Sequence, residues 1–145
     1  MSREERSSVI GIITGLLVNA YIVIRLTQLY KQGALSGDDA VTVWAQTVVW
    51  AIPAAIIITI VLYITFTLTD SERALNNIVD ERDRKFQLRG MGTTLVGAAL
   101  GYVAMIVTLA FGGNIVVGLT IMYGSIALGD LSGNIVRIAS YRIGG

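Results

Sequence analysis

The chain has 145 residues, of which 54% are hydrophobic and only 14% charged, and its mean hydropathy is +0.69. An ordinary soluble domain carries about 25% charged residues, so this composition excludes a disordered chain and argues against a soluble domain. The chain contains no Cys and no His. That absence excludes disulfides, cysteine-held metal clusters, His-ligated haem and Ser-His-Asp catalysis from this chain alone. The formal net charge of +1 provides no concentrated basic surface for nucleic acid.

Long uncharged runs predict the helices that span a membrane. The first run, residues 7–24, continues past Arg25 and predicts a helix over residues 8–30. A cleaved signal peptide is the competing interpretation, but no small-x-small cleavage site follows cleanly. The second run, residues 40–69, predicts one long helix over residues 41–69, since two spans would need about forty residues. Pro53 lies inside this helix and predicts a bend there.

The third uncharged run, residues 90–129, has forty residues and is long enough for two spans. Gly112, Gly113 and Asn114 supply a turn midway, because glycine and asparagine tolerate left-handed backbone geometry. We therefore expect helices over residues 91–111 and 115–137. The predicted fold is all-α: one transmembrane domain covering residues 1–145, folded as an integral membrane four-helix bundle.

Lysine and arginine near the helix ends predict the orientation. With four spans, nine basic residues lie on the side of both termini and two, Arg25 and Lys31, on the other side. Both termini are therefore expected in the cytoplasm, in a multi-pass protein of the plasma (bacterial inner) membrane.

Small residues spaced four apart allow membrane helices to approach closely. Such pairs are expected at helix contacts, either within the chain or between subunits. They are Gly11 with Gly15, Gly97 with Gly101, and Gly129 with Gly133.

Asp130 is the acidic residue expected deepest in the membrane. It lies fifteen residues into the last predicted helix, about 22 Å from its start, so its carboxylate should be paired, hydrated or protonated. Counting depth from the other helix ends brings hydroxyls to a similar level, and the short hairpin favours Thr94 as the neighbour. These hydroxyls belong to Thr14, Tyr63, Thr65 and Thr94. The group is interpreted either as a relay for protons or cations, or as a structural hydrogen bond near the interface.

Residues 70–89 hold nearly half of the charge. Asp80 with Arg84, and Glu81 with Lys85, are acid-first pairs four apart, the favourable order on a helix. We expect an extension of the second helix, a turn around residues 76–77, and a short charged helix that enters the third span. The segment is interpreted as an ion-paired or docking motif, with a plain solvated surface as the alternative, and a metal site is not expected. The residues of this motif are Asp80, Glu81, Asp83, Arg84, Lys85 and Arg89.

The run from Asp80 to Gly90, read with the tail from Tyr141 to Gly144, resembles a known pattern. It is similar to the D-E-R-D-x-x-I-x-x-R-G loop of a family of small four-span bacterial and archaeal membrane proteins of unknown function. Phe86 stands where that family has an aliphatic residue, and Ile143 departs from its Tyr-Arg-Arg-Gly tail. The resemblance implies the same topology and supplies no activity.

The sequence favours a non-enzymatic membrane protein that acts by helix–helix association, without cofactor or metal. Its expected partners are the lipid bilayer and either further copies of itself, as a homo-oligomer, or other subunits of a membrane complex. The alternative is a small proton- or cation-coupled transporter or channel that uses Asp130.

Overall fold

The computed structural model describes the backbone of residues 3–69 and 81–143, and the side chains of residues 5–68 and 84–143. Four helices make up this part of the chain: α1 (Arg3–Lys31), α2 (Ala40–Thr69), α3 (Glu81–Ala110) and α4 (Ile115–Ile143). Each helix is long and apolar enough to cross a membrane, and the described residues form no strand. The predicted all-α fold with four spanning helices is therefore confirmed.

Three helix ends differ from the prediction by more than one residue. α1 begins five residues before residue 8, α3 begins ten residues before residue 91, and α4 ends six residues after residue 137. The uncharged run marks only the part of a helix that lies in hydrocarbon, whereas the backbone hydrogen bonds continue into the charged residues on either side. Residues 81–89 and the third span form one helix; the expected extension of α2 and the turn around residues 76–77 lie outside the described residues.

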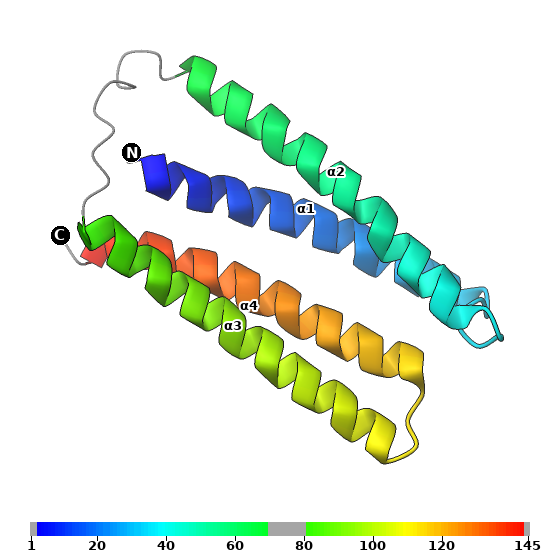
Figure 1. The fold of residues 1–145 in the computed structure, drawn as a ribbon. Coiled ribbons are helices and arrows are strands. Elements are labelled where there is room, and N and C mark those ends of the chain that lie inside the picture. Colours follow the sequence, from blue (N-terminus) through cyan, green and yellow to red (C-terminus); the bar gives the residue numbers. More distant parts are fainter. Residues whose placement is uncertain (1–2, 70–80, 144–145) are drawn as a thin grey trace.

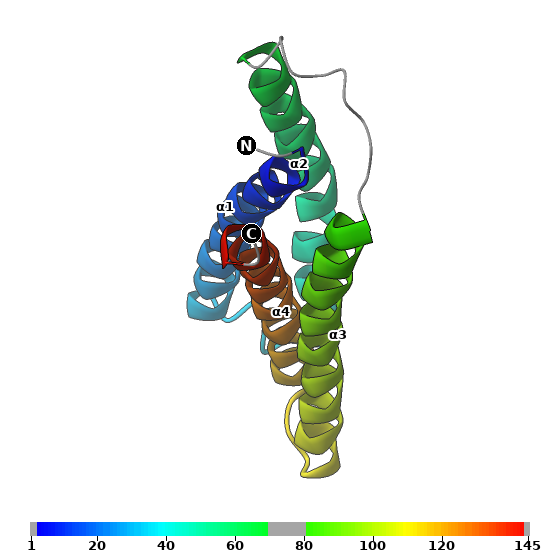
Figure 2. The ribbon, with the colours of Figure 1, turned by 90° about the vertical axis from the view of Figure 1, so that its left-hand side faces the viewer.

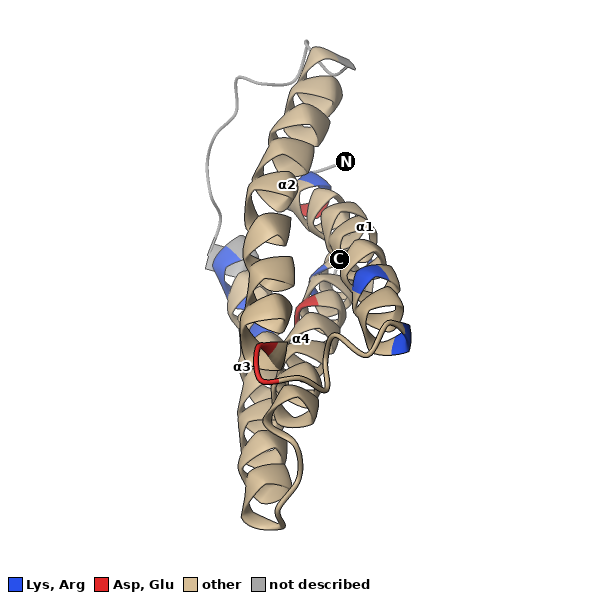
Figure 3. Cartoon of the chain, turned by 90° about the vertical axis from the view of Figure 1, so that its right-hand side faces the viewer, with Lys and Arg blue, Asp and Glu red and all other residues tan. Residues whose placement is uncertain are grey.

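The helices run alternately up and down. Both termini, the end of α2 and the start of α3 lie at one end of the molecule, and the two short connections lie at the other (Figures 1 and 2). α2 packs on α1, α1 packs on α4, and α4 makes the most extensive contact of all with α3, while α2 touches α4 only lightly. α2 carries no charged residue along its length, as Figure 3 shows.

The turn between α3 and α4 is built as the sequence predicts. Gly112 has a φ of 74°, and its amide donates a hydrogen bond to the carbonyl of Leu109 at 3.0 Å, which ends α3. Asn114 then begins α4, because its Oδ1 accepts a hydrogen bond from the amide of Val116 at 2.7 Å. Gly112 thus ends α3 and Asn114 begins α4 within a short turn, which holds the two helices antiparallel.

Glycine brings the backbones of α3 and α4 into direct contact. A Cβ added to Gly97 would lie 2.7 Å from the Cα of Gly129, and one added to Gly133 would lie 2.6 Å from the carbonyl oxygen of Gly90. Carbon atoms pack at about 3.5–4.0 Å, so this contact leaves no room for a side chain. We call this line of contact the glycine seam. Its small residues are Gly90, Gly97, Gly101, Ser125, Gly129 and Gly133.

The best-buried apolar cluster lies toward the end with the short connections, where α1, α2 and α4 meet. Ile22 is 1% exposed, and the ring of Trp44 lies edge-on to Tyr123 with a centroid distance of 6.5 Å. Trp44 also donates a hydrogen bond from its Nε1 to the hydroxyl of Thr120 at 3.0 Å. This cluster fixes α2 against α4 on one side of the candidate site.

Candidate functional site

A cavity of about 360 Å³ lies between α1, α2 and α4. Gly11, Gly15 and Val18 form part of its α1 wall, and Ala55 contributes to its α2 wall. Five of its lining residues carry polar side chains, although the surrounding helices are apolar. These are Thr14, Asn19, Thr59, Tyr123 and Asp130.

Among the described residues that line this cavity, Asp130 alone carries a carboxylate. Its Oδ2 accepts a hydrogen bond from Nδ2 of Asn134 at 3.4 Å, and the same nitrogen donates to the backbone oxygen of Asp130 at 3.0 Å. A Cβ added to Gly15 would lie 4.0 Å from that Oδ2. The carboxylate therefore lies over a glycine of α1 and is held from one side by an amide of its own helix, while the residue as a whole remains exposed.

The other polar groups form two pairs that join the helices. The hydroxyl of Tyr123 donates to Oδ1 of Asn19 at 2.6 Å, which links α4 to α1. The hydroxyl of Thr59 donates to that of Thr14 at 3.4 Å, which links α2 to α1. A cavity that contains a carboxylate, an amide and three hydroxyls offers several oxygen atoms to one small ligand, as hard cations require.

The position of Asp130 along α4 places it away from the charged end of the molecule. Arg137 follows seven residues later, a distance of about 10 Å at about 1.5 Å per residue. The stretch from Gly90 to Gly129 contains no charge, so Asp130 lies at the boundary of the apolar part of the hairpin. A proton or a cation at this place would neutralise the carboxylate where hydrocarbon disfavours its charge.

The structure separates the four hydroxyls that depth alone placed beside Asp130. Thr14 lines the cavity with Asp130. Tyr63 lies one turn beyond Thr59 on α2, and Thr65 donates its hydroxyl to the backbone of its own helix, to the carbonyl oxygen of Val61.

The expected contact between Thr94 and Asp130 is wrong. The hydroxyl of Thr94 donates to the carbonyl oxygens of Gly90 and Gly129, at 3.3 and 3.4 Å, because this residue belongs to the glycine seam. Asp130 follows Gly129 by one residue and is therefore turned about 100° around α4, toward α1. Equal depth does not imply a shared face.

Sequence reasoning did not assign Asn19, Thr59, Tyr123 and Asn134 to the site. Helical periodicity contains a signal that could have found most of them. Residues 11, 14, 15 and 18 on α1, and residues 123, 126, 127 and 130 on α4, follow the spacing of three and four that defines one helix face. Polar residues on these two faces are the ones that meet in the cavity.

The predicted packing glycines lie at contacts within the chain. Gly97, Gly101, Gly129 and Gly133 belong to the glycine seam, and Gly11 faces the side chain of Asn134, whose Oδ1 would be 3.1 Å from an added Cβ. Gly15 lies beneath Asp130, as described above. The structure therefore uses these small residues to join α1, α3 and α4 of one chain.

The charged segment that precedes the third span is only partly described. Asp80 lies outside the described residues, as do the side chains of Glu81 and Asp83. Arg84 and Lys85 are exposed, and the guanidinium carbon of Arg89 lies 5.9 Å from the ring centroid of Phe86. The predicted pairing within this motif stays a prediction.

Comparison with protein-family models, with curated proteins and with solved structures gave no match. Among the described residues, no group of three or more acidic residues is arranged to hold a metal ion. The function must therefore be argued from the cavity itself.

Proposed function

We propose that this chain is a small multi-pass membrane protein that binds a proton or a monovalent cation in the cavity between α1, α2 and α4, and that Asp130 is the binding group. The observation that supports the proposal is a carboxylate in a cavity lined by polar groups from three helices. A chain with no His and no Cys lacks the usual groups of an enzyme active site, so the proposed activity is binding or transport.

The energetics favour a ligand of single positive charge. An ionised carboxylate costs about 2.5–3.5 kcal/mol at the centre of a membrane helix on insertion scales, which is an upper bound for Asp130 at the boundary of the uncharged stretch. Asn134 offers one long hydrogen bond, which does not neutralise the charge. One proton or one monovalent cation does so, whereas a divalent cation would leave an uncompensated charge, because the described residues that line the cavity include no second carboxylate.

We further propose that both termini face the cytoplasm and that the membrane is the plasma membrane. The start of α1, the end of α2, the start of α3 and the end of α4 lie at the same end of the molecule (Figure 1). Nine of the eleven Lys and Arg residues belong to that end. The positive-inside rule assigns such an end to the cytoplasm.

The test is ion movement in vesicles that contain the purified protein. Wild-type protein should dissipate an imposed gradient of H⁺, Na⁺ or K⁺, each tested in turn with an internal dye, and Asp130→Asn should reduce the rate to that of empty vesicles. Asp39→Asn is the matched control, because it makes the same chemical change in the exposed connection between α1 and α2. Circular dichroism verifies that both variants fold.

Two results would contradict the proposal. One is an Asp130→Asn variant that moves ions as fast as wild type. The other is a wild-type protein that moves none of these ions and also shows no heat of binding for Na⁺ or K⁺ and no pH-dependent proton uptake in calorimetry. A third result would narrow the proposal: if wild-type protein takes up protons without moving ions across the membrane, and Asp130→Asn takes up none, the function is binding and not transport.

A second candidate function is association, as a homo-oligomer or as a subunit of a larger membrane complex. The supporting observation is the small share of the apolar stretch that the chain itself buries, 11% in α2 and 6% in α3. The glycine pairs do not add to this argument, because they lie at contacts within the chain. Cross-linking in native membranes distinguishes the two candidates: association predicts defined oligomers that persist in Asp130→Asn.

A further inference from the structure

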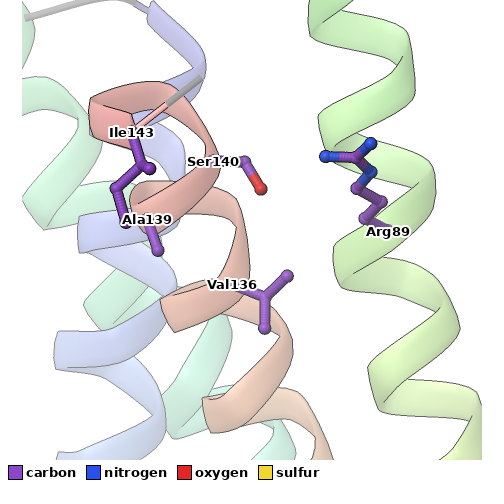
Figure 4. A pocket seen from close by; sticks show the side chains of 5 residues that line it. All are labelled: Arg89, Val136, Ala139, Ser140 and Ile143. Carbon is purple, nitrogen blue, oxygen red and sulfur yellow. The ribbon is translucent and has the colours of Figure 1, made fainter. Parts of the chain in front are cut away.

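A second hollow lies on the surface at the end of the molecule that holds the termini, between α3 and α4. It has a volume of about 310 Å³ and is lined by Arg89 of α3 and by Val136, Ala139, Ser140 and Ile143 of α4. Figure 4 shows the side chain of Arg89 extending from α3 toward the hydroxyl of Ser140. Val136 and Ala139 precede Ser140 on α4 and lie on the side toward the middle of the helix. We call this hollow the arginine groove.

The basic groups at the groove have no acidic partner in the described part of the chain. Arg89 is exposed, and its recorded contact is with the ring of Phe86. The Nε of Arg137 is enclosed against Gly90, the residue after Arg89, and has no hydrogen-bond partner among the described residues. By contrast, Arg142 is paired with Glu5 at 3.5 Å. Among the described residues, the guanidinium of Arg89 at the groove therefore faces no carboxylate that would neutralise it.

The other residues that line the groove indicate which kind of ligand fits. A guanidinium and a hydroxyl that face each other suit a phosphate oxygen, which accepts hydrogen bonds from both. Val136 and Ala139 add apolar walls to the groove on the side toward the middle of α4. A ligand that fits has an anionic phosphate at one end and a hydrocarbon chain at the other.

We propose that the arginine groove binds one anionic phospholipid, with its phosphate between Arg89 and Ser140 and an acyl chain along Ala139 and Val136. Charge complementarity supports this occupant, because basic groups at a cytoplasmic face attract anionic lipids, and this argument rests on the orientation proposed above. The proposal is independent of the Asp130 cavity, which opens among α1, α2 and α4.

The experiment measures lipid binding to the full chain by native mass spectrometry in a mild detergent. Phosphatidylglycerol should bind more tightly than phosphatidylcholine with the same acyl chains. Arg89→Gln should weaken phosphatidylglycerol binding about tenfold, since it removes a charge-assisted hydrogen bond. Lys31→Gln, an equal loss of charge at the opposite end, should leave binding unchanged.

A second variant tests the apolar strip without changing the charge. Ala139→Trp fills the groove and should also weaken phosphatidylglycerol binding, whereas Leu128→Trp, on an exposed position of the same helix, should not. Equal binding of the two lipids, or full binding by Arg89→Gln, would overturn the proposal. Displacement of phosphatidylglycerol by millimolar inorganic phosphate, with no effect of Ala139→Trp, would show a free-phosphate site and would also overturn it.

Discussion

The substitution Gly97→Ala tests whether backbone contact holds α3 and α4 together. The new methyl group would lie 2.7 Å from the Cα of Gly129 and 3.0 Å from the carbonyl oxygen of Ser125. Carbon–carbon contact needs about 3.5–4.0 Å, so the two helices must separate by about 1 Å. Overpacking of this kind costs about 1–3 kcal/mol, and we expect the free energy of unfolding to fall by that amount relative to an alanine substitution on the same helix that meets no neighbour.

Gly92→Ala is the matched control on the same helix, because nothing lies within 4 Å of the Cβ position of Gly92. Both substitutions gain the helix propensity of alanine, up to about 1 kcal/mol, so the difference between them isolates the contact. The assay is reversible unfolding in mixed micelles with increasing fractions of dodecyl sulfate, followed by circular dichroism. Equal stability of Gly97→Ala and Gly92→Ala would refute the argument for a tight seam.

Three further predictions concern the connections between helices and the topology. Asn114→Ala removes the side chain that caps α4 and should lower the free energy of unfolding by about 1 kcal/mol in the same micelle assay. Gly112→Ala places a Cβ at a φ of 74° and should cost about 1–2 kcal/mol, whereas Gly37→Ala, in open space and without positive φ, should change little. A cysteine at Ser36 should react with an impermeant reagent in intact cells and a cysteine at Ser71 only after permeabilisation; the reverse pattern would invert the proposed orientation.

Charge-free runs predicted the spans well because hydrocarbon tolerates few charges in any arrangement. The turn at residues 112–114 followed from the same logic, since a run of forty residues needs a break and only glycine and asparagine offered one. The ends of α1, α3 and α4 were placed inside the observed ends because a helix continues past the first charged residue when its backbone can still bond to itself. Local composition thus determines what must be helical inside the membrane and says little about where each helix ends outside it.

The sequence predicted part of the candidate site, namely Asp130 and Thr14, and missed the other polar residues that line the cavity. Asp130 stood out because it is a lone carboxylate beside a long uncharged run, and residue counting gave its depth and brought in Thr14. The choice of Thr94 failed because depth along a helix fixes one coordinate and rotation about the axis is the other. Rotation is set by how the glycine seam turns α4 against α3, and that requires the positions of two helices at once. Asn19 and Tyr123, which are 104 residues apart, could not be paired from either segment alone.

The glycine seam also limits how this molecule can move. Side chains at an ordinary helix contact can change rotamer and let one helix slide, but glycines in backbone contact have no rotamers to change. α3 and α4 therefore behave as one rigid unit. By contrast, α1 and α2 contact α4 through longer side chains such as Asn134 and Trp44. Any change in the width of the Asp130 cavity must therefore come from movement of α1 and α2 relative to the α3–α4 pair. The helices that can move are thus those of the first half of the chain.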